Sequence, residues 1–247
     1  MIKSFFVAAF FQPLYNILVV LTDILPGHDI GLAIILLTIL VRLGLFPLYH
    51  KSTKTQAKLK EIEPELKALK EKHQDREAQA KAMMELYKNH GINPFSGFML
   101  LLIQLPIILS LYYVFRDSLD MHLDLVYSFV TFPQITSSMF LGWLDITGKS
   151  LAMAVLVGVT QFIQMQLALP ALPKKTGNKE SFGDDLSRSM QLQMKYFLPV
   201  MIIFIARSLP IAISLYWITS NIFSIGHELI VKKKALGFLA KIKGPKS

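Results

Sequence analysis

The stretch from Ile30 to Tyr49 is apolar except for one charged residue, Arg42. A run of this length predicts a membrane-spanning helix, because roughly 20 apolar residues cross the hydrocarbon core of a bilayer. A charged side chain at mid-bilayer costs about 2.5–3.5 kcal/mol on insertion scales, so such a residue usually has a function. Thr38, one helical turn earlier, is expected on the same face. The alternative is that Arg42 only extends its charge to the nearer interface.

The remaining sequence contains further apolar runs. Hydrophobic residues make up 53% of the chain and its mean hydropathy is +0.45, which indicates an integral membrane protein. The run from Tyr196 to Val231 would form a single helix about 54 Å long, far longer than a hydrocarbon core of about 30 Å. We therefore expect two spans there, with a turn at residues 207–210. Altogether the sequence predicts an all-α membrane protein with five transmembrane helices.

Two other segments are expected to be helical without crossing the membrane. In residues 1–28, Pro13 is expected to break the helix, which favours an amphipathic helix lying at the interface. The side chains expected in the acyl region are Phe5, Phe6, Phe10, Phe11 and Leu14. An additional span is the alternative. Residues 51–93 carry narrow apolar stripes on both sides of a polar break at residues 73–76, which predicts a cytoplasmic helical hairpin kinked at Pro64. The apolar stripes of the two helices either pack against each other or form a docking surface for a ribosome, a translocase or a nascent chain.

The lysine and arginine pattern predicts an N-out, C-in orientation. The segments after the first, third and fifth spans hold 10, 5 and 6 of these residues, whereas the opposite side holds four.

The predicted segments are an extracytoplasmic interfacial helix (1–28), the first span (29–50), the cytoplasmic hairpin (51–93), the second span (94–116), an extracytoplasmic loop (117–149), the third span (150–170), a cytoplasmic loop (171–189), the fourth span (190–208), the fifth span (209–231) and a basic cytoplasmic tail (232–247).

Several kinds of chemistry are excluded by the sequence. The net charge of +9 follows this membrane topology and does not indicate nucleic-acid binding. The chain has no cysteine, which excludes disulfides, thiolate zinc sites and iron–sulfur ligation. The spans hold no Asp or Glu away from their ends, and Val231 stands where a zinc-protease motif beginning at His227 would need a second histidine. With no phosphate-binding loop or internal repeat, we expect neither an enzyme nor a cofactor.

Uncharged polar residues on several spans are expected to surround Arg42. Any one of them could form only a hydrogen bond between helices, which is the commoner role. One inward-facing polar residue on each of several spans is better explained by a hydrated concavity, because such groups are costly to expose to lipid. The candidate residues are Thr38, Arg42, Gln104, Gln161, Gln164, Tyr216, Trp217, Ser220 and Asn221.

These residues lie in stretches that resemble the YidC/Oxa/Alb family of membrane-protein insertases, specifically the bacterial YidC core without its large periplasmic domain. The stretches are LAIILLTILVRLGLFPL (32–48), LYKNHGINPFSGFMLLLIQLPIILSLYYVF (86–115), MFLGWLDIT (139–147) and MKYFLPVMIIFIARSLPIAISLYWITSNIFSIG (194–226). The resemblance implies five transmembrane helices around a hydrophilic groove that is open to cytoplasm and lipid and closed on the outer side. It matches the groove arginine to Arg42, the glutamine of the third span to Gln161 or Gln164, and the aromatic residue of the fifth span to Trp217.

The resemblance also implies a function. It predicts an insertase or chaperone in the bacterial cytoplasmic (inner) membrane that moves hydrophobic segments of nascent membrane proteins into the lipid bilayer. A passive ion or solute pore and a scaffold subunit of a translocase are the alternatives. The ribosome and the SecYEG translocase are candidate partners, although the short tail after residue 231 argues against strong ribosome binding by this chain alone.

Overall fold

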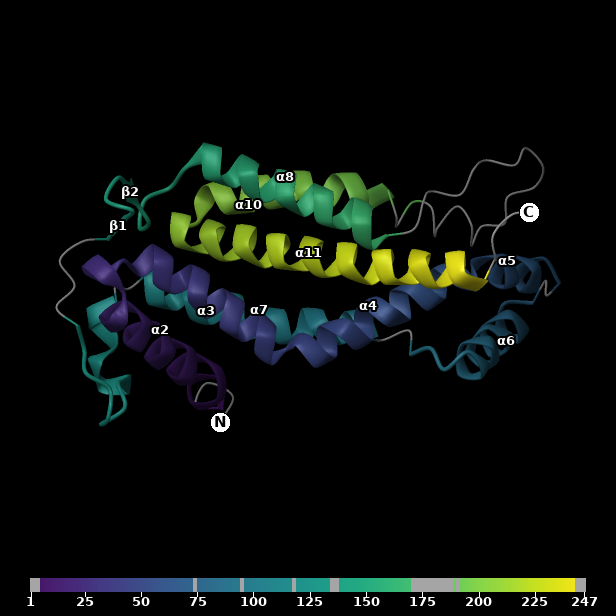
Figure 1. The fold of residues 1–247 in the computed structure, drawn as a ribbon, viewed down its shortest axis with the longest axis horizontal. Helices are drawn as coiled ribbons and strands as arrows, with labels where there is room; N and C mark the ends of the chain where they lie inside the picture. The colour runs from purple at the N-terminus through teal and green to yellow at the C-terminus, as the bar shows by residue number, and fades with distance from the viewer. Residues whose placement is uncertain are drawn as a thin grey trace. The chain divides into compact units, whose positions relative to one another are not determined.

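The structure, a computed structural model, describes residues 5–72, 75–93, 96–116, 119–133, 138–169, 189 and 192–242. These residues are mostly helical, as predicted, with one two-stranded antiparallel ladder among them. The predicted cytoplasmic loop lies outside the described residues, except for residue 189. The chain divides into two compact units, which are described separately below: the first comprises residues 1–44 and 103–227, and the second comprises residues 45–102 and 228–247 (Figure 1).

The first unit begins with a helix that passes through Pro13. A π-helical turn, η1 (Val7–Phe11), continues directly into α2 (Gln12–Ile24), where Pro13 occupies the first turn. The expected break at Pro13 is therefore wrong, because proline is tolerated in the first turn of an α-helix and the π-turn precedes it. Phe11 is buried against Tyr15 and His122, so its expected place in the acyl region is also wrong. The helix is long and apolar enough to cross a membrane.

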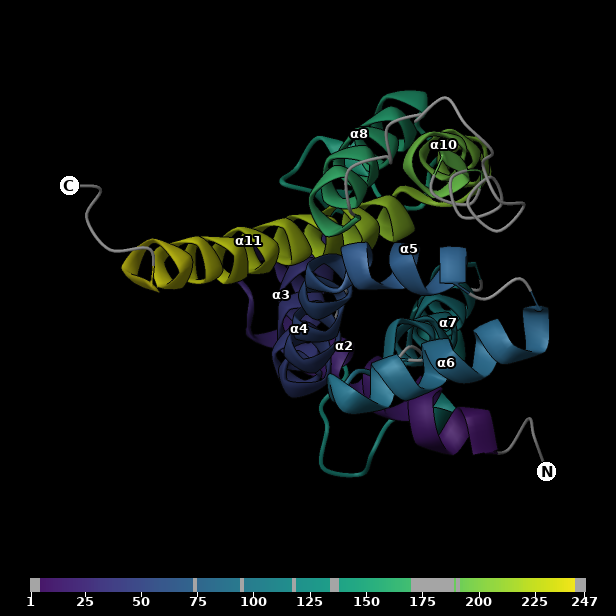
Figure 2. The ribbon, with the colours of Figure 1, turned by 90° about the vertical axis from the view of Figure 1, so that its right-hand side faces the viewer.

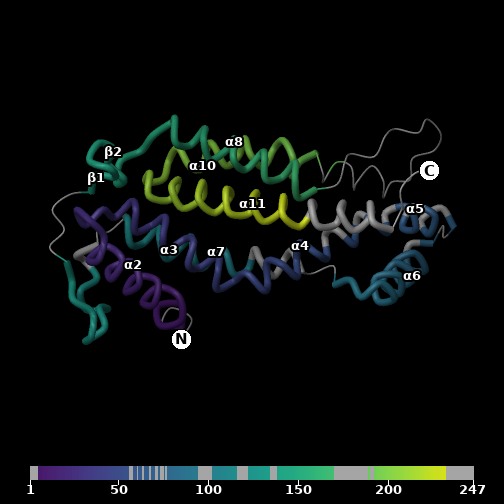
Figure 3. The backbone as a smooth tube through the Cα atoms, in the orientation of Figure 1, coloured from purple at the N-terminus to yellow at the C-terminus, as the bar shows by residue number. Residues whose placement is uncertain are grey.

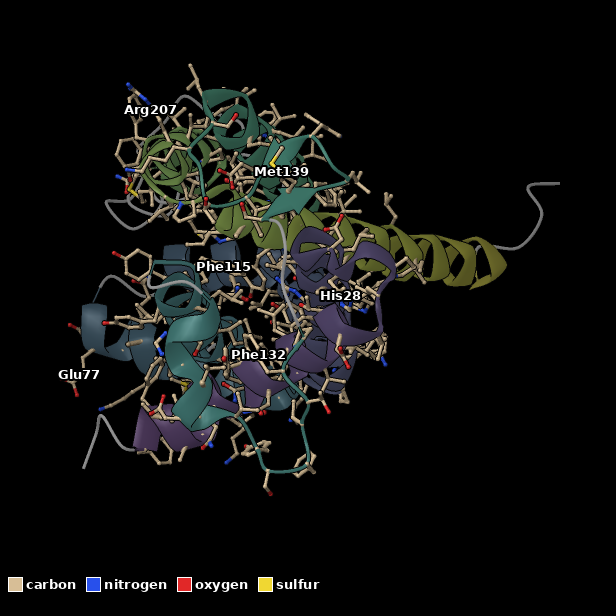
Figure 4. The ribbon with its side chains drawn as sticks, turned by 90° about the vertical axis from the view of Figure 1, so that its left-hand side faces the viewer. His28, Glu77, Phe115, Phe132, Met139 and Arg207 are labelled. Carbon is tan, nitrogen blue, oxygen red and sulfur yellow. The ribbon has the colours of Figure 1, made fainter. Side chains whose placement is uncertain are left out.

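One end of the first unit is held together by hydrogen bonds between distant segments. After the 3-10 turn η2 (Pro26–His28), Asp29 accepts from Leu32 N at 2.9 Å in α3 (Ile30–Gly44) and from Leu141 N at 2.7 Å. Leu141 lies in the turn between β1 (Met139–Phe140) and β2 (Leu144–Asp145). Gly31 is needed there, because a Cβ at this position would overlap the ring of Phe140. Figure 4 views this end of the unit, with His28 and Met139 labelled.

The connection after β2 is tied to the start of α11 (Ile211–Ile242). Ile211 N donates to Gly148 O at 2.9 Å and Ala212 N donates to Ile146 O at 2.9 Å. Hydrogen bonds from Ser138 and Thr147 hold the pKa of the Asp145 carboxyl below its ordinary value.

The segment around η3 (Leu119–Leu125) is attached to α2 through Asn16. The Asn16 side chain donates to Leu125 O at 2.8 Å and accepts from Tyr127 N at 2.7 Å. The described residues between η3 and α8 are therefore anchored by hydrogen bonds to the Asn16 side chain of α2, to the Asp29 side chain before α3 and to the backbone at the start of α11.

Two helices of the first unit pack closely side by side. They are α8 (Leu151–Ala168) and the continuous helix formed by η4 (Gln193–Phe197) and α10 (Leu198–Ser208). A Cβ at Gly158 would overlap Ile203, so the absent side chain lets the two backbones approach. Ala154, Val157 and Ala206 are buried between them. Figures 1 and 2 show α8 and α10 together, with the first half of α11 beside them.

The second unit contains three helices in sequence, α4 (Phe46–Glu61), α5 (Glu63–Lys72) and α6 (Arg76–Asn89), and the beginning of α7 (Ser96–Arg116) (Figure 3). The chain leaves helical geometry at Ile62, and Pro64 lies in the first turn of α5. Asp75 caps α6 by accepting from Ala78 N at 3.0 Å. His90 lies 3.1 Å from the Glu65 carboxylate, and α5 packs against α6.

Length and hydropathy identify two described helices that could cross a membrane, Val7–Ile24 and Leu151–Ala168. The pair Ile30–Gly44 and Phe46–Thr55 would add a third if it forms one broken span. Leu102–Phe115 is apolar but shorter. The five spans, the interfacial position of residues 1–28 and the hairpin therefore remain predictions.

Candidate functional site

Arg42 lies near the end of α3 and is only 7% exposed. Its Nη2 donates to the Ser220 hydroxyl of α11. Tyr216, one turn before Ser220, accepts a hydrogen bond at its hydroxyl from Gln104 Nε2 of α7. The Tyr216 hydroxyl also lies within hydrogen-bonding reach of Ser220 and close enough to Arg42 for electrostatic interaction. These four residues, called the arginine cluster below, connect three helices of the first unit.

The arginine cluster solvates the guanidinium with neutral oxygen atoms. A guanidinium has five N–H donors and no acceptor, so hydroxyl oxygens suit it as partners. Burial of an ion is expensive unless hydrogen bonds replace its hydration. The contacts with Ser220 and Tyr216 provide such bonds and dipoles without adding an opposite charge. A guanidinium is also well suited to bind a carboxylate, because its N–H donors can form two parallel charge-assisted hydrogen bonds with the two oxygens.

A second polar group lies between α8 and α11. Gln161 Nε2 donates to Gln164 Oε1 at 3.0 Å, and Asn221 Nδ2 donates to Thr160 Oγ1 at 3.1 Å. Gln161 is buried, whereas Gln164 is half-buried. Because Ser220 and Asn221 are neighbours on α11, this helix connects the arginine cluster with the polar residues of α8.

Two predicted site residues have different surroundings. Thr38 is buried in α3 and its hydroxyl donates to Ile34 O at 2.6 Å, a bond within its own helix. Trp217 is half-buried and packs against Ala154, Val157 and Ala206. The structure thus brings Arg42, Gln104, Tyr216 and Ser220 into one network and assigns Trp217 to the packing between α8, α10 and α11.

A family model described as "60Kd inner membrane protein" matches residues 21–237, which include every residue of both polar groups. The chain belongs to the 60Kd inner membrane protein family. Relatives named "Membrane protein insertase YidC" occur in Francisella tularensis subsp. novicida (strain U112) and subsp. tularensis (strain SCHU S4). Each is 35% identical over 208 residues, covering 82% of this chain and 32% of the relative. The chain thus spans about a third of the length of these curated relatives.

A solved structure of the family has a similar fold. It is described as "Active YidC insertase crystal structure with the first transmembrane domain resolved". Its TM-score with this chain is 0.52 at 27% sequence identity, and the alignment covers 80% of this chain and 40% of that one. The fold and the membrane location of the family agree with the apolar helices described above.

In this family member the structure adds polar residues that the sequence interpretation missed. Ser224 and His227 continue the line of Tyr216 and Ser220 along α11, and all four side chains are buried. We call these four residues the α11 polar stripe. Their spacing of four, four and three residues places them on one helical face, so helical periodicity would have found them. Thr160 was missed because a single threonine in an apolar helix commonly bonds only to its own backbone.

Proposed function

We propose that this chain is a membrane-protein insertase that guides hydrophobic segments of nascent proteins from the cytoplasm into the bilayer. The observation that carries the proposal is the arginine cluster, in which Ser220 holds Arg42 among predicted spans that have no acidic residue away from their ends. The name shared by the relatives and the similar fold of a solved YidC insertase support it. The proposal includes five spans in the bacterial inner membrane, oriented N-out and C-in.

The proposed path for the translocated segment follows the α11 polar stripe to Arg42. A short extracellular segment of a substrate carries backbone groups and often carboxylates that hydrocarbon cannot satisfy. Water and polar side chains along the stripe would replace part of its hydration. Arg42 would pair with a substrate carboxylate through an attraction of a few kcal/mol, about 4 kcal/mol at most in a partly screened site. This strength lets the substrate leave again, and burial of its apolar helix in lipid completes insertion.

The second unit supplies the proposed cytoplasmic receiving surface. Its helices α4 to α6 are rich in exposed polar side chains, and Met84 of α6 is an exposed apolar residue among them. An amphipathic helix surface of this kind suits a transient contact with a nascent hydrophobic segment. We include the ribosome and the SecYEG translocase as proposed partners at this surface.

Reconstitution of the purified chain tests the proposal. Proteoliposomes containing only this protein should insert a small single-spanning substrate with an acidic N-tail, measured as protease protection of the tail inside the vesicles. Protein-free liposomes and heat-unfolded protein are the controls. Folded protein that gives no insertion above the empty liposomes would contradict an autonomous insertase and favour a scaffold. Ion flux through the vesicles without substrate would favour a pore.

A further inference from the structure

An open hollow of about 480 Å³ lies in the first unit where α8 begins and α10 ends. It is distinct from both polar groups of the functional site. Its lining combines two cations, two hydroxyl groups and two apolar side chains. The residues are Lys149, Ser150, Leu151, Phe204, Arg207 and Ser208. Figure 4 shows Arg207 projecting outward from the end of α10.

The polar part of the hollow presents two positive charges, those of Lys149 and Arg207. Lys149 and Arg207 are both exposed, and neither forms an ion pair with a residue that the structure describes. Ser150 accepts from Met153 N at 3.3 Å as the cap of α8, so its hydroxyl hydrogen remains available as a donor. The hollow can therefore hold an anion with acceptor oxygens through two cations and one hydroxyl.

The apolar part of the hollow continues along the two helices. Leu151 is 59% exposed and Phe204 is 68% exposed. Val155 and Val159 follow Leu151 at four-residue intervals on α8, and Val200 lies one turn from Phe204 on α10; all three are also exposed. Four-residue spacing puts each set on one helical face. A ligand that fits both parts has an anionic head and long apolar chains.

We propose that this hollow binds the phosphate of an anionic phospholipid, with its acyl chains lying along the exposed faces of α8 and α10. Lys149 and Arg207 contact the phosphate oxygens, and Ser150 donates a hydrogen bond to them. Leu151 and Phe204 contact the first methylene groups. In the proposed N-out orientation the lipid belongs to the outer leaflet of the membrane.

Photocrosslinking in nanodiscs tests this site directly. The full chain is reconstituted in phosphatidylcholine nanodiscs containing a few mole per cent of phosphatidylglycerol with a diazirine in one acyl chain. Labelled peptides are then mapped by mass spectrometry. K149Q/R207Q should lower labelling of the peptides that contain Leu151 and Phe204 by about thirtyfold, because each cation near an anionic lipid contributes about 1 kcal/mol. The single variant R207Q should lower the labelling by about fivefold.

Two control variants separate local charge from total charge. K149R/R207K keeps both cations and should label within about twofold of wild type. K54Q/K88Q makes the same change in net charge at exposed positions of the second unit. Labelling of the peptides that contain Leu151 and Phe204 should then be the same as in wild type. Excess unlabelled phosphatidylglycerol should abolish labelling, whereas excess inorganic phosphate should not.

Three outcomes would overturn the proposal. Unchanged labelling in K149Q/R207Q and R207Q would show that the cations do not hold the lipid. Equal loss of labelling in K54Q/K88Q would reduce the effect to overall charge. Displacement by inorganic phosphate would identify the hollow as a site for a soluble anion. The insertion assay is independent of these results, because it reads the passage of a substrate and not lipid binding.

Discussion

Replacing Arg42 by alanine should lower insertion of a substrate with an acidic N-tail by at least about tenfold. The guanidinium would be the charged partner of the substrate carboxylate, and a loss of about 1.4 kcal/mol of attraction corresponds to a factor of ten. The measurement is the rate at which the tail becomes protease-protected in proteoliposomes. Alanine places no charge in this buried position, so the variant should keep the fold, which gel filtration will check.

The substrate tail and the lysine variant provide the controls for this prediction. A substrate whose tail carries amides in place of carboxylates should insert at similar rates with wild type and Arg42→Ala. Arg42→Lys keeps the charge but not the planar fork of donors, so it should retain a substantial part of the activity. Equal losses for acidic and neutral tails would contradict an electrostatic role and assign Arg42 to structure.

Ser220→Asp should impair insertion of the acidic substrate about as strongly as Arg42→Ala. Ser220 already accepts a hydrogen bond from Arg42, so a carboxylate at this position would form an internal ion pair with the guanidinium. Within a buried site this pair would occupy Arg42 and remove the charge that attracts the substrate. The same protease-protection assay measures the effect.

Ser220→Ala is the matched control for Ser220→Asp. It removes the hydroxyl acceptor without introducing a charge, so we expect a loss within about threefold, close to the value of one hydrogen bond. Full activity in Ser220→Asp would show that neutralising Arg42 does not matter for the substrate. A loss in Ser220→Ala as large as that in Ser220→Asp would mean that the hydroxyl itself, and not the charge, supports insertion.

Helical periodicity accounts for the parts of the site that the sequence anticipates. Arg42 is conspicuous because it is the one charge in a long apolar run, and Tyr216 and Ser220 share a helical face through their four-residue spacing. Tertiary packing decides which helices meet at that face. From the sequence, Gln104 and Tyr216 could therefore only be assigned to a common cavity. The hydrogen bond between these residues, which are 112 positions apart, could not be predicted. Trp217 directly follows Tyr216 on α11 but lies on a different side of the helix. It therefore packs against α8 and α10 and does not belong to the arginine cluster.

The predictions for Pro13 and Phe11 were wrong, and the anchoring of the loop was not predicted, because these features depend on the structure around each residue. Proline normally breaks a helix interior, but the π-turn Val7–Phe11 places Pro13 in the first turn of α2. Phe11 looks like a lipid-facing residue by composition, yet it packs on Tyr15 and His122. The bonds of Asp29 and Asn16 to the loop join positions more than 100 residues apart, and no local pattern reports such contacts.

The proposed insertion path places the translocated tail of a substrate along the α11 polar stripe. Disulfide crosslinking tests it most directly, because the chain contains no cysteine. A substrate with one cysteine in its N-tail is combined, during insertion, with Ser224→Cys or with Ile222→Cys, which is 57% exposed on another face of α11. We predict that the crosslink forms with Ser224→Cys at least about five times more often than with Ile222→Cys, given the different helical faces on which the two positions lie. Equal or stronger crosslinking to Ile222→Cys would show that the tail passes along that other, exposed face of α11 and not along the polar stripe.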